Sequence, residues 1–119
     1  MAMKGLRPLR LASFIQQEIA TVLLTQSRNP LLQDIVITHV KVSDDLHEVK
    51  VYYRVMGDES LDLYKTTLGK ATSFITRSIG PNLKMPFIPR FSFIYDTTVT
   101  DEERMESLLT NLKRDESDV

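Results

Sequence analysis

The sequence predicts an α+β fold, in which one small domain carries a mixed three-stranded sheet with its helices on one face. Apolar residues recur at helical spacing in three segments and at strand-like spacing in three others. The predicted order is α-β-β-α-β-α, and a helix that joins two strands of one sheet makes that pair parallel through a right-handed crossover. The 119 residues, 42% of them hydrophobic, fit one domain with one core. We assign residues 1–114 to this domain and expect the acidic tail at 115–119 to be disordered.

The first predicted helix covers residues 8–26, because apolar side chains between Leu11 and Leu23 recur every three or four positions. Pro8 suits the first turn of such a helix, where a missing N–H costs nothing. The pair Asn29-Pro30 then ends the element.

Two strands joined by a hairpin follow at residues 35–43 and 47–56. The first is rich in β-branched residues. In the second, every other side chain from Val49 to Val55 is apolar, which indicates that one face is buried. The connecting residues SDDLHE favour a turn, because Ser and Asp form local hydrogen bonds to the backbone.

The longest predicted helix covers residues 61–83, with Ser60 as its N-cap and a continuous apolar stripe along one side. A third strand follows within PRFSFIYD, and a last amphipathic helix covers residues 100–114. The predicted core includes Ile15, Ile19, Val40, Val51, Tyr53, Leu68, Ile75, Ile79, Phe91 and Phe93.

A weak point is expected inside the long helix, at Ala71, Thr72 and Ser73. A serine can bend a helix by bonding back to an earlier carbonyl, so we predict a bend or break here, with Ser73 exposed. Phe74 falls near the exposed side of an unbroken helix, where it could stack on a nucleobase. A bend would instead bury Phe74 in the core, and this is the interpretation we favour.

Charge is segregated along the chain, although the formal net charge is only −1. Residues 1–100 contain 12 Lys and Arg against 9 Asp and Glu, whereas residues 101–119 contain 3 against 7. No acid occurs between Asp62 and Asp96, and none occurs in residues 1–17. Such local imbalance favours a polyanionic partner.

The cations of the long helix are predicted to form one row. Lys70, Arg77 and Lys84 are seven residues apart, and each step of seven drifts by only about 20° around a helix. The row lies nearly opposite the apolar stripe, so it can follow a phosphate backbone, whereas an ordinary solvated face usually mixes both signs of charge. The candidate RNA-binding residues are Lys70, Ser73, Arg77, Lys84, Arg90 and, on the N-terminal arm, Lys4, Arg7 and Arg10.

The sequence contains no recognisable catalytic, metal or cofactor pattern. It has no cysteine, no glycine-rich phosphate loop and no apolar run of the roughly 18 residues that a membrane span needs. His39 and His47 flank a turn with two aspartates, but a solvated hairpin explains them better than a metal or acid–base site. Two alternatives to RNA binding stay open: a protein–protein adaptor that uses the sheet surface, and an enzyme at this hairpin.

The sequence resembles the ribosome-binding factor A family over nearly its whole length. The resemblance rests on several short motifs in a fixed order and spacing. They are R-x-x-R at Arg7 and Arg10, Asn29-Pro30, VSDDL at 42–46, K-V-Y at 50–52, Ile79-Gly80, and P-x-F-x-F-x-Y-D at 89–96.

The resemblance implies a type II KH-like domain. Ordinary KH domains clamp single-stranded nucleic acid with a Gly-x-x-Gly loop, which this family replaces by a helix–kink–helix with Ala-x-Gly at the kink. Ala71-Thr72-Ser73 corresponds to that kink, with serine in place of glycine. By resemblance, the protein is a monomeric, cytoplasmic, non-enzymatic factor without a cofactor, a metal, a membrane contact or a small-molecule substrate. It is expected to bind the free small (30S) ribosomal subunit and its 16S rRNA, and to assist late maturation of the subunit and processing of 16S rRNA.

Overall fold

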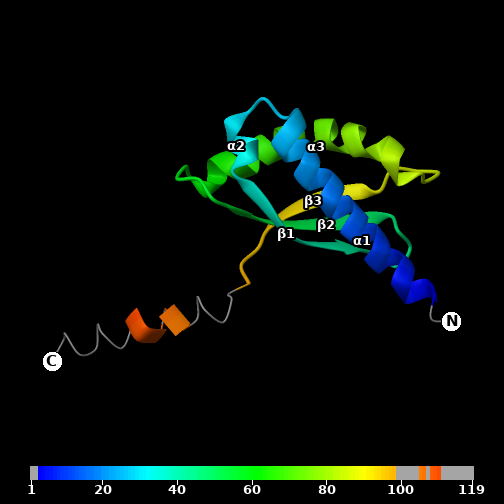
Figure 1. Cartoon of the computed structure of the whole chain (residues 1–119), viewed down its shortest axis with the longest axis horizontal. Coiled ribbons are helices and arrows are strands. Elements are labelled where there is room, and N and C mark those ends of the chain that lie inside the picture. The colour runs from blue at the N-terminus through cyan, green and yellow to red at the C-terminus, as the bar shows by residue number, and fades with distance from the viewer. Residues whose placement is uncertain (1–2, 99–104, 107, 111–119) are drawn as a thin grey trace.

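The computed structural model describes residues 3–98, 105–106 and 108–110, with residues 3–6 described in their backbone alone. Figure 1 shows the helix α1 crossing over the sheet, with α3 alongside. The α+β class and the order of the main elements are confirmed, and one short helix is added. The elements are α1 (Met3–Thr21), the π-helix η1 (Val22–Gln26), α2 (Pro30–Gln33), β1 (Ile35–Val42), β2 (Glu48–Val55), α3 (Leu61–Leu83) and β3 (Arg90–Tyr95).

The sheet has the strand order β1-β2-β3. β1 and β2 are antiparallel, with Val40 opposite Val51, and β2 and β3 are parallel, with Val51 beside Phe93. The parallel pair follows from the crossover through α3, as predicted. The register of β1 shifts between Ile37 and His39, so that Thr38 forms a bulge without a partner on β2.

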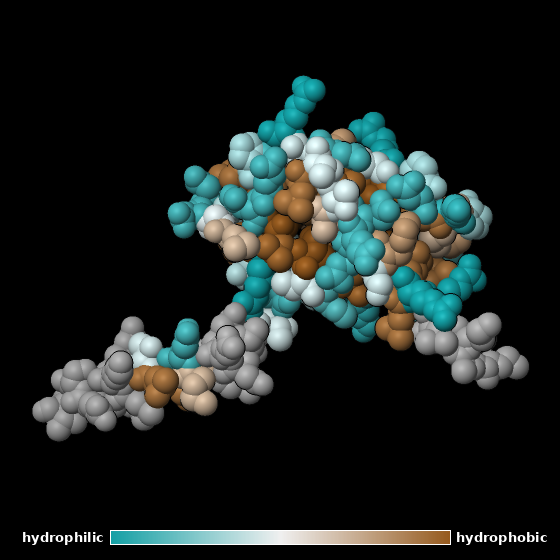
Figure 2. All heavy atoms as spheres, viewed as in Figure 1, coloured by the Kyte–Doolittle hydropathy of each residue, from teal (hydrophilic) through white to brown (hydrophobic). Residues whose placement is uncertain are grey.

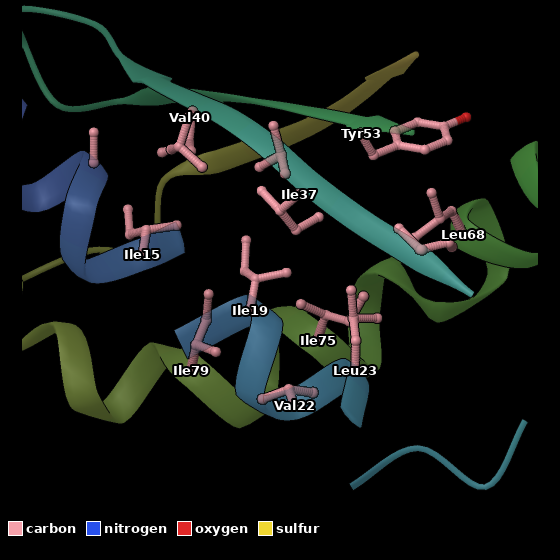
Figure 3. Close-up of a cluster of buried hydrophobic side chains, with 14 of the residues drawn as sticks. Ile15, Ile19, Val22, Leu23, Ile37, Val40, Tyr53, Leu68, Ile75 and Ile79 are labelled. Carbon is pink, nitrogen blue, oxygen red and sulfur yellow. The ribbon is translucent and has the colours of Figure 1, made fainter. Parts of the chain in front are cut away.

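The core lies between one face of the sheet and the helices α1 and α3. Figure 3 shows isoleucines of both helices pointing toward the side chains of the strands. Eight of the ten predicted core residues are buried, whereas Phe91 and Phe93 are only partly buried. Both phenylalanines belong to β3, which is an edge strand and has a neighbouring strand on one side only. No helix in the described part of the chain has the length and hydropathy that a bilayer span requires.

The first helix differs from its prediction at both ends. α1 begins at Met3, so Pro8 lies inside the helix rather than in its first turn. Pro8 has no N–H to donate to the carbonyl of Lys4, and its ring crowds the same carbonyl, so the first turn of α1 forms at a local cost. At the other end, the chain widens into η1, and Asn29 then caps α2 by accepting a bond from the Leu31 N–H at 3.0 Å. Asn29-Pro30 therefore starts a second short helix, in addition to following the first.

The long helix keeps its predicted bounds, but it has no break. Ser60 caps α3 as expected, and α-helical backbone runs without interruption through Ala71, Thr72 and Ser73. The expected break is absent, because each of these residues has helical backbone. The Thr72 hydroxyl, rather than that of Ser73, makes the predicted type of bond to an earlier carbonyl, donating to that of Leu68 at 2.9 Å. Ser73 is exposed, as predicted.

Phe74 corrects a second expectation at the same place. Its side chain is 36% exposed rather than buried in the core. The physical reason is the continuity of α3: in an unbroken helix this position faces away from the apolar stripe.

The C-terminal segment is described only in part. Residues 105–106 and 108–110 have helical backbone, and Met105, Leu108 and Leu109 are exposed. The remainder of the predicted helix at 100–114, and the tail at 115–119, lie outside the described residues.

Candidate nucleic-acid interface

The outer face of α3 carries the predicted cationic row. Lys70 and Arg77 are exposed, and Ser73 lies between them on the same face. The Arg77 Nε donates to the Ser73 carbonyl oxygen at 3.3 Å, one helical turn earlier. This bond holds the guanidinium along the helix while its terminal N–H groups stay available, and these can bind a phosphate with two parallel bonds.

Lys84 lies at the end of the row, but its backbone is not helical, as a helical wheel would assume. It is the C-cap of α3 and has a left-handed backbone, with φ 53° and ψ 41°. The direction of its side chain is therefore set by the helix end rather than by the heptad spacing. Lys84 is exposed at the C-terminal end of α3, just beyond its last helical residue.

A groove with a volume of about 640 Å³ begins where α3 ends. Two cations of α1, Arg7 and Arg10, lie at this groove together with Lys84, which stands more than 70 positions further along the chain. None of the nine described lining residues is acidic. They are Arg7, Arg10, Leu11, Phe14, Leu46, Asn82, Leu83, Lys84 and Met85.

The α1 side of the groove follows directly from helical spacing. Arg7, Arg10 and Phe14 stand at positions i, i+3 and i+7, which share one face of a helix. Figure 2 shows hydrophobic surface bordered by hydrophilic side chains at the end of the molecule where α1 begins. The Phe14 side chain is 38% exposed, so the floor of the groove offers an accessible aromatic ring.

The β1–β2 turn supplies another part of the lining. Asp45 accepts hydrogen bonds from the Ser43 hydroxyl at 2.7 Å and from the His47 N–H at 3.0 Å, and these bonds lower the pKa of its carboxyl group. The turn places Leu46 in a left-handed conformation, with φ 65°, and buries its side chain at the groove. The predicted turn chemistry of SDDLHE thus also shapes the candidate site.

Arg90 does not join the row on α3. In β3, Phe91 points toward the core, so Arg90 and Ser92 point to the opposite, open face of the sheet. On that face Lys41 lies directly opposite Lys50 in the antiparallel register. Like charges in such a pair repel each other. The predicted cations therefore fall on two surfaces, with Arg90 on the sheet and the others on the helices. The side chain of Lys4 is outside the described set.

The open sheet face also carries acids, unlike the groove. Glu48 lies beside Arg90 in the parallel register. Asp96 accepts a bond from the Thr38 hydroxyl at 2.5 Å and from the Thr98 N–H at 2.8 Å, and these bonds lower its pKa from 3.8 to about 2. Its carboxylate is consequently ionised at neutral pH. We therefore regard the α3 face and the groove as the stronger candidate for binding a polyanion.

The two histidines do not belong to a metal-binding group within the described residues. The His47 ring stacks on Phe87 with centroids 4.1 Å apart, and His39 lies against Tyr52 at 5.8 Å. No described group of three or more His, Cys, Asp or Glu residues could hold a metal ion. Their contacts are those of aromatic packing.

Sequence reasoning missed the groove as a unit. It named Arg7, Arg10 and Lys84 separately, but Phe14, Asn82 and Met85 gave no signal of a shared site. The spacing from Arg7 to Phe14 could have indicated a basic and aromatic face on α1. Only the tertiary structure shows that this face lies beside the end of α3.

Comparisons with known proteins agree on one family. The family model described as Ribosome-binding factor A matches residues 7–109. A ribosome-binding factor A of Pediococcus pentosaceus is 34% identical over 108 residues, which cover 89% of this chain and 93% of that relative. The crystal structure of ribosome-binding factor A from Thermus thermophilus matches with a TM-score of 0.65 at 18% identity, covering 74% of this chain and 94% of that one.

A second Thermus thermophilus structure is a homology model of the factor fitted into a cryo-EM map of its complex with the 30S subunit. It matches with a TM-score of 0.57 at 19% identity, covering 70% of this chain and 88% of that one. The shared arrangement of strands and helices is the KH-like fold that the motifs led us to expect.

Proposed function

Because this chain belongs to the ribosome-binding factor A family, we propose that it is a non-enzymatic assembly factor that binds the free 30S subunit through 16S rRNA. In this role it assists late maturation of the subunit and processing of 16S rRNA. The family supports the choice of partner, as does the relative whose structure was fitted into a map of a 30S complex. A factor with this partner acts in the cytoplasm, and we propose that it binds as a monomer without a cofactor.

The observation that carries this proposal is a basic surface on α3 and at the groove, whose described lining contains no acid, while Glu18 bonds to Asn82 at its edge. It starts at Lys70, passes Ser73 and Arg77 on α3, and reaches Lys84, Arg7 and Arg10 at the groove. Neutralising phosphates with such cations releases counterions, so binding weakens as salt rises. Three or four phosphate contacts give a log–log slope of affinity against salt of roughly −2 to −4.

Co-sedimentation with purified ribosomal particles tests the proposal. We expect the protein to sediment with free small subunits and not with complete ribosomes, and we expect the bound fraction to fall steeply with salt. A protein that binds neither particle at low salt would refute the proposed function.

Charge reversal then locates the surface. Arg77→Glu should weaken binding to the small subunit and leave the melting curve nearly unchanged, because Arg77 is exposed and lies outside the core. The triple variant of Lys70, Arg77 and Lys84 to Glu should abolish binding. A matched triple variant on the open sheet face, with Lys41, Lys50 and Arg90 changed to Glu, should bind more strongly than the first triple.

The reverse ranking of the two triple variants would move the RNA surface to the sheet. Equal binding by both variants and the unchanged protein, with all three folded, would instead favour a protein–protein adaptor.

A further inference from the structure

The groove at the end of α3 has a lining that phosphate binding alone does not explain. Backbone phosphates need cations, which Arg7, Arg10 and Lys84 provide, but the floor between them is apolar. It contains Leu11, Leu83, Met85 and the exposed ring of Phe14. Combining a cationic rim with an accessible aromatic ring is the pattern by which proteins hold single-stranded nucleic acid.

We propose that this groove binds an unstacked nucleotide of single-stranded RNA, with its base against Phe14 and its flanking phosphates on Arg7, Arg10 and Lys84. This inference rests on the proposed function and adds to it a specific class of ligand and a site. A volume of about 640 Å³ is enough for such a ligand, since pockets for small molecules measure roughly 300–1,000 Å³.

The placement of the cations favours this occupant. Arg7 and Arg10 lie one helical turn apart on α1, and Phe14 lies one turn further on the same face. Lys84 approaches from α3. A nucleotide whose base rests on Phe14 therefore has cations available from two different elements. The left-handed backbone of Lys84 ends α3 at the groove instead of extending the helix past it.

Asn82 gives the groove a polar edge with a defined orientation. Its amide Nδ2 donates to the Glu18 Oε2 at 3.1 Å, so its carbonyl Oδ1 stays available as an acceptor. A nucleobase carries N–H donors on its edge that can bond to such an acceptor. The carboxylate of Glu18 is occupied by this bond, because its Oε2 accepts from the Asn82 amide.

A duplex fits this lining poorly. An A-form helix keeps its bases stacked inside and offers phosphates and 2′-hydroxyls to a protein. It would leave the apolar floor and Phe14 without contacts. Single-stranded RNA should consequently bind better than a hairpin of the same composition.

Fluorescence anisotropy with a labelled single-stranded RNA of twelve nucleotides, and with a hairpin of equal composition, provides the test. We expect Phe14→Ala to weaken binding of the single strand by about 5- to 150-fold, the range that base–aromatic stacking gives. The control is Leu24→Ala, because Leu24 is 65% exposed on η1 and does not line the groove. We expect this control to bind like the unchanged protein.

A second variant guards against loss of folding. Phe14→Leu keeps an apolar side chain at the groove beside Leu11 and should melt like the unchanged protein. It should still weaken binding of the single-stranded RNA relative to binding of the hairpin. Ultraviolet irradiation should cross-link the same RNA to the peptides that contain Phe14 or Met85. The proposal is overturned if the Phe14 and Leu24 variants bind alike, if the hairpin binds as well as the single strand, or if cross-links fall on the strands of the sheet.

The two proposals fail in different ways. If the unchanged protein does not sediment with small subunits, the proposed function fails. If it does sediment, but its affinity for single-stranded RNA does not depend on Phe14, only the groove assignment fails. A cross-link from Phe14 to a ribosomal protein of the small subunit instead of to rRNA would also overturn the groove assignment, because an acidic peptide would then be the occupant.

Discussion

A side chain at Gly57 should destabilise the fold, although this residue lies in the connection between β2 and α3. A Cβ atom at this position would lie 1.9 Å from the Tyr64 hydroxyl oxygen and 2.3 Å from the Asp34 Oδ2. The Tyr64 hydroxyl donates to that carboxylate at 2.9 Å, and the ring of Tyr64 is fully buried. Gly57→Ala must therefore push these two groups apart.

The size of the effect follows from two opposing terms. Breaking a hydrogen bond to a charged acceptor costs about 1.5–3 kcal/mol. Replacing Gly by Ala recovers about 0.4–1 kcal/mol through the unfolded chain, because no glycine among the described residues has a positive φ. The net destabilisation is then about 0.5–2.5 kcal/mol.

Gly69→Ala is the matched control for this prediction. A Cβ atom there would meet nothing within 4 Å, and the residue lies inside α3. Alanine in a helix interior is about 1 kcal/mol more favourable than glycine, so this variant should be more stable than the unchanged protein. The same chemical change thus has opposite signs at two positions of one chain.

Urea denaturation of both variants measures the difference, and a melting curve should show it as well. One kcal/mol corresponds to a shift in Tm of about 4–8 °C for a domain of this size. In a Tyr64→Phe background the cost of Gly57→Ala should shrink, because the nearest clashing atom is gone. A Gly57→Ala protein as stable as Gly69→Ala would refute the contact among Gly57, Tyr64 and Asp34.

Two further variants test other parts of the structure. Lys84→Gly should leave stability unchanged or raise it by up to about 1.6 kcal/mol, because relief of the left-handed backbone, about 1–2 kcal/mol, offsets the entropy of about 0.4–1 kcal/mol that glycine adds to the unfolded chain. The same variant should weaken RNA binding. A parallel loss of both stability and binding would contradict the assignment of Lys84 to the groove. Asp96 has its pKa lowered to about 2 from 3.8, so its contribution to stability is present above pH 3.8 and is lost as the pH falls toward 2. The urea midpoint of Asp96→Asn should therefore be lower than that of the unchanged protein at pH 7, and the two midpoints should converge near pH 2. A constant difference between the midpoints over this range would mean that the bond from the Thr38 hydroxyl does not set the pKa of Asp96.

The sequence by itself determined the elements whose signals are local. The bounds of α3 follow from the cap at Ser60 and the apolar stripe, and both were predicted correctly. The alternation in β2 and the turn residues before it fixed the hairpin in the same way. These features depend on interactions between residues a few positions apart, so the linear pattern contains the information.

Other local features were misjudged because two local effects compete and the tertiary environment decides between them. Ala71, Thr72 and Ser73 permit either a bend or a regular helix, and packing of Leu68 and Ile75 on both sides of this stretch into one core keeps α3 continuous. Continuity in turn leaves Phe74 half-exposed. For Pro8, the helix gains more from extending toward Met3 than the proline costs, which its position in the sequence does not reveal.

The groove was decided by tertiary structure alone. The heptad spacing of Lys70, Arg77 and Lys84 is visible in the sequence, and so is the spacing of Arg7, Arg10 and Phe14. Nothing in either pattern says that the start of α1 lies beside the end of α3. Strand alternation likewise sends Arg90 to the open face once Phe91 packs inward. Sequence spacing defines a face within one element, whereas the packing of the elements around a shared core determines which faces meet.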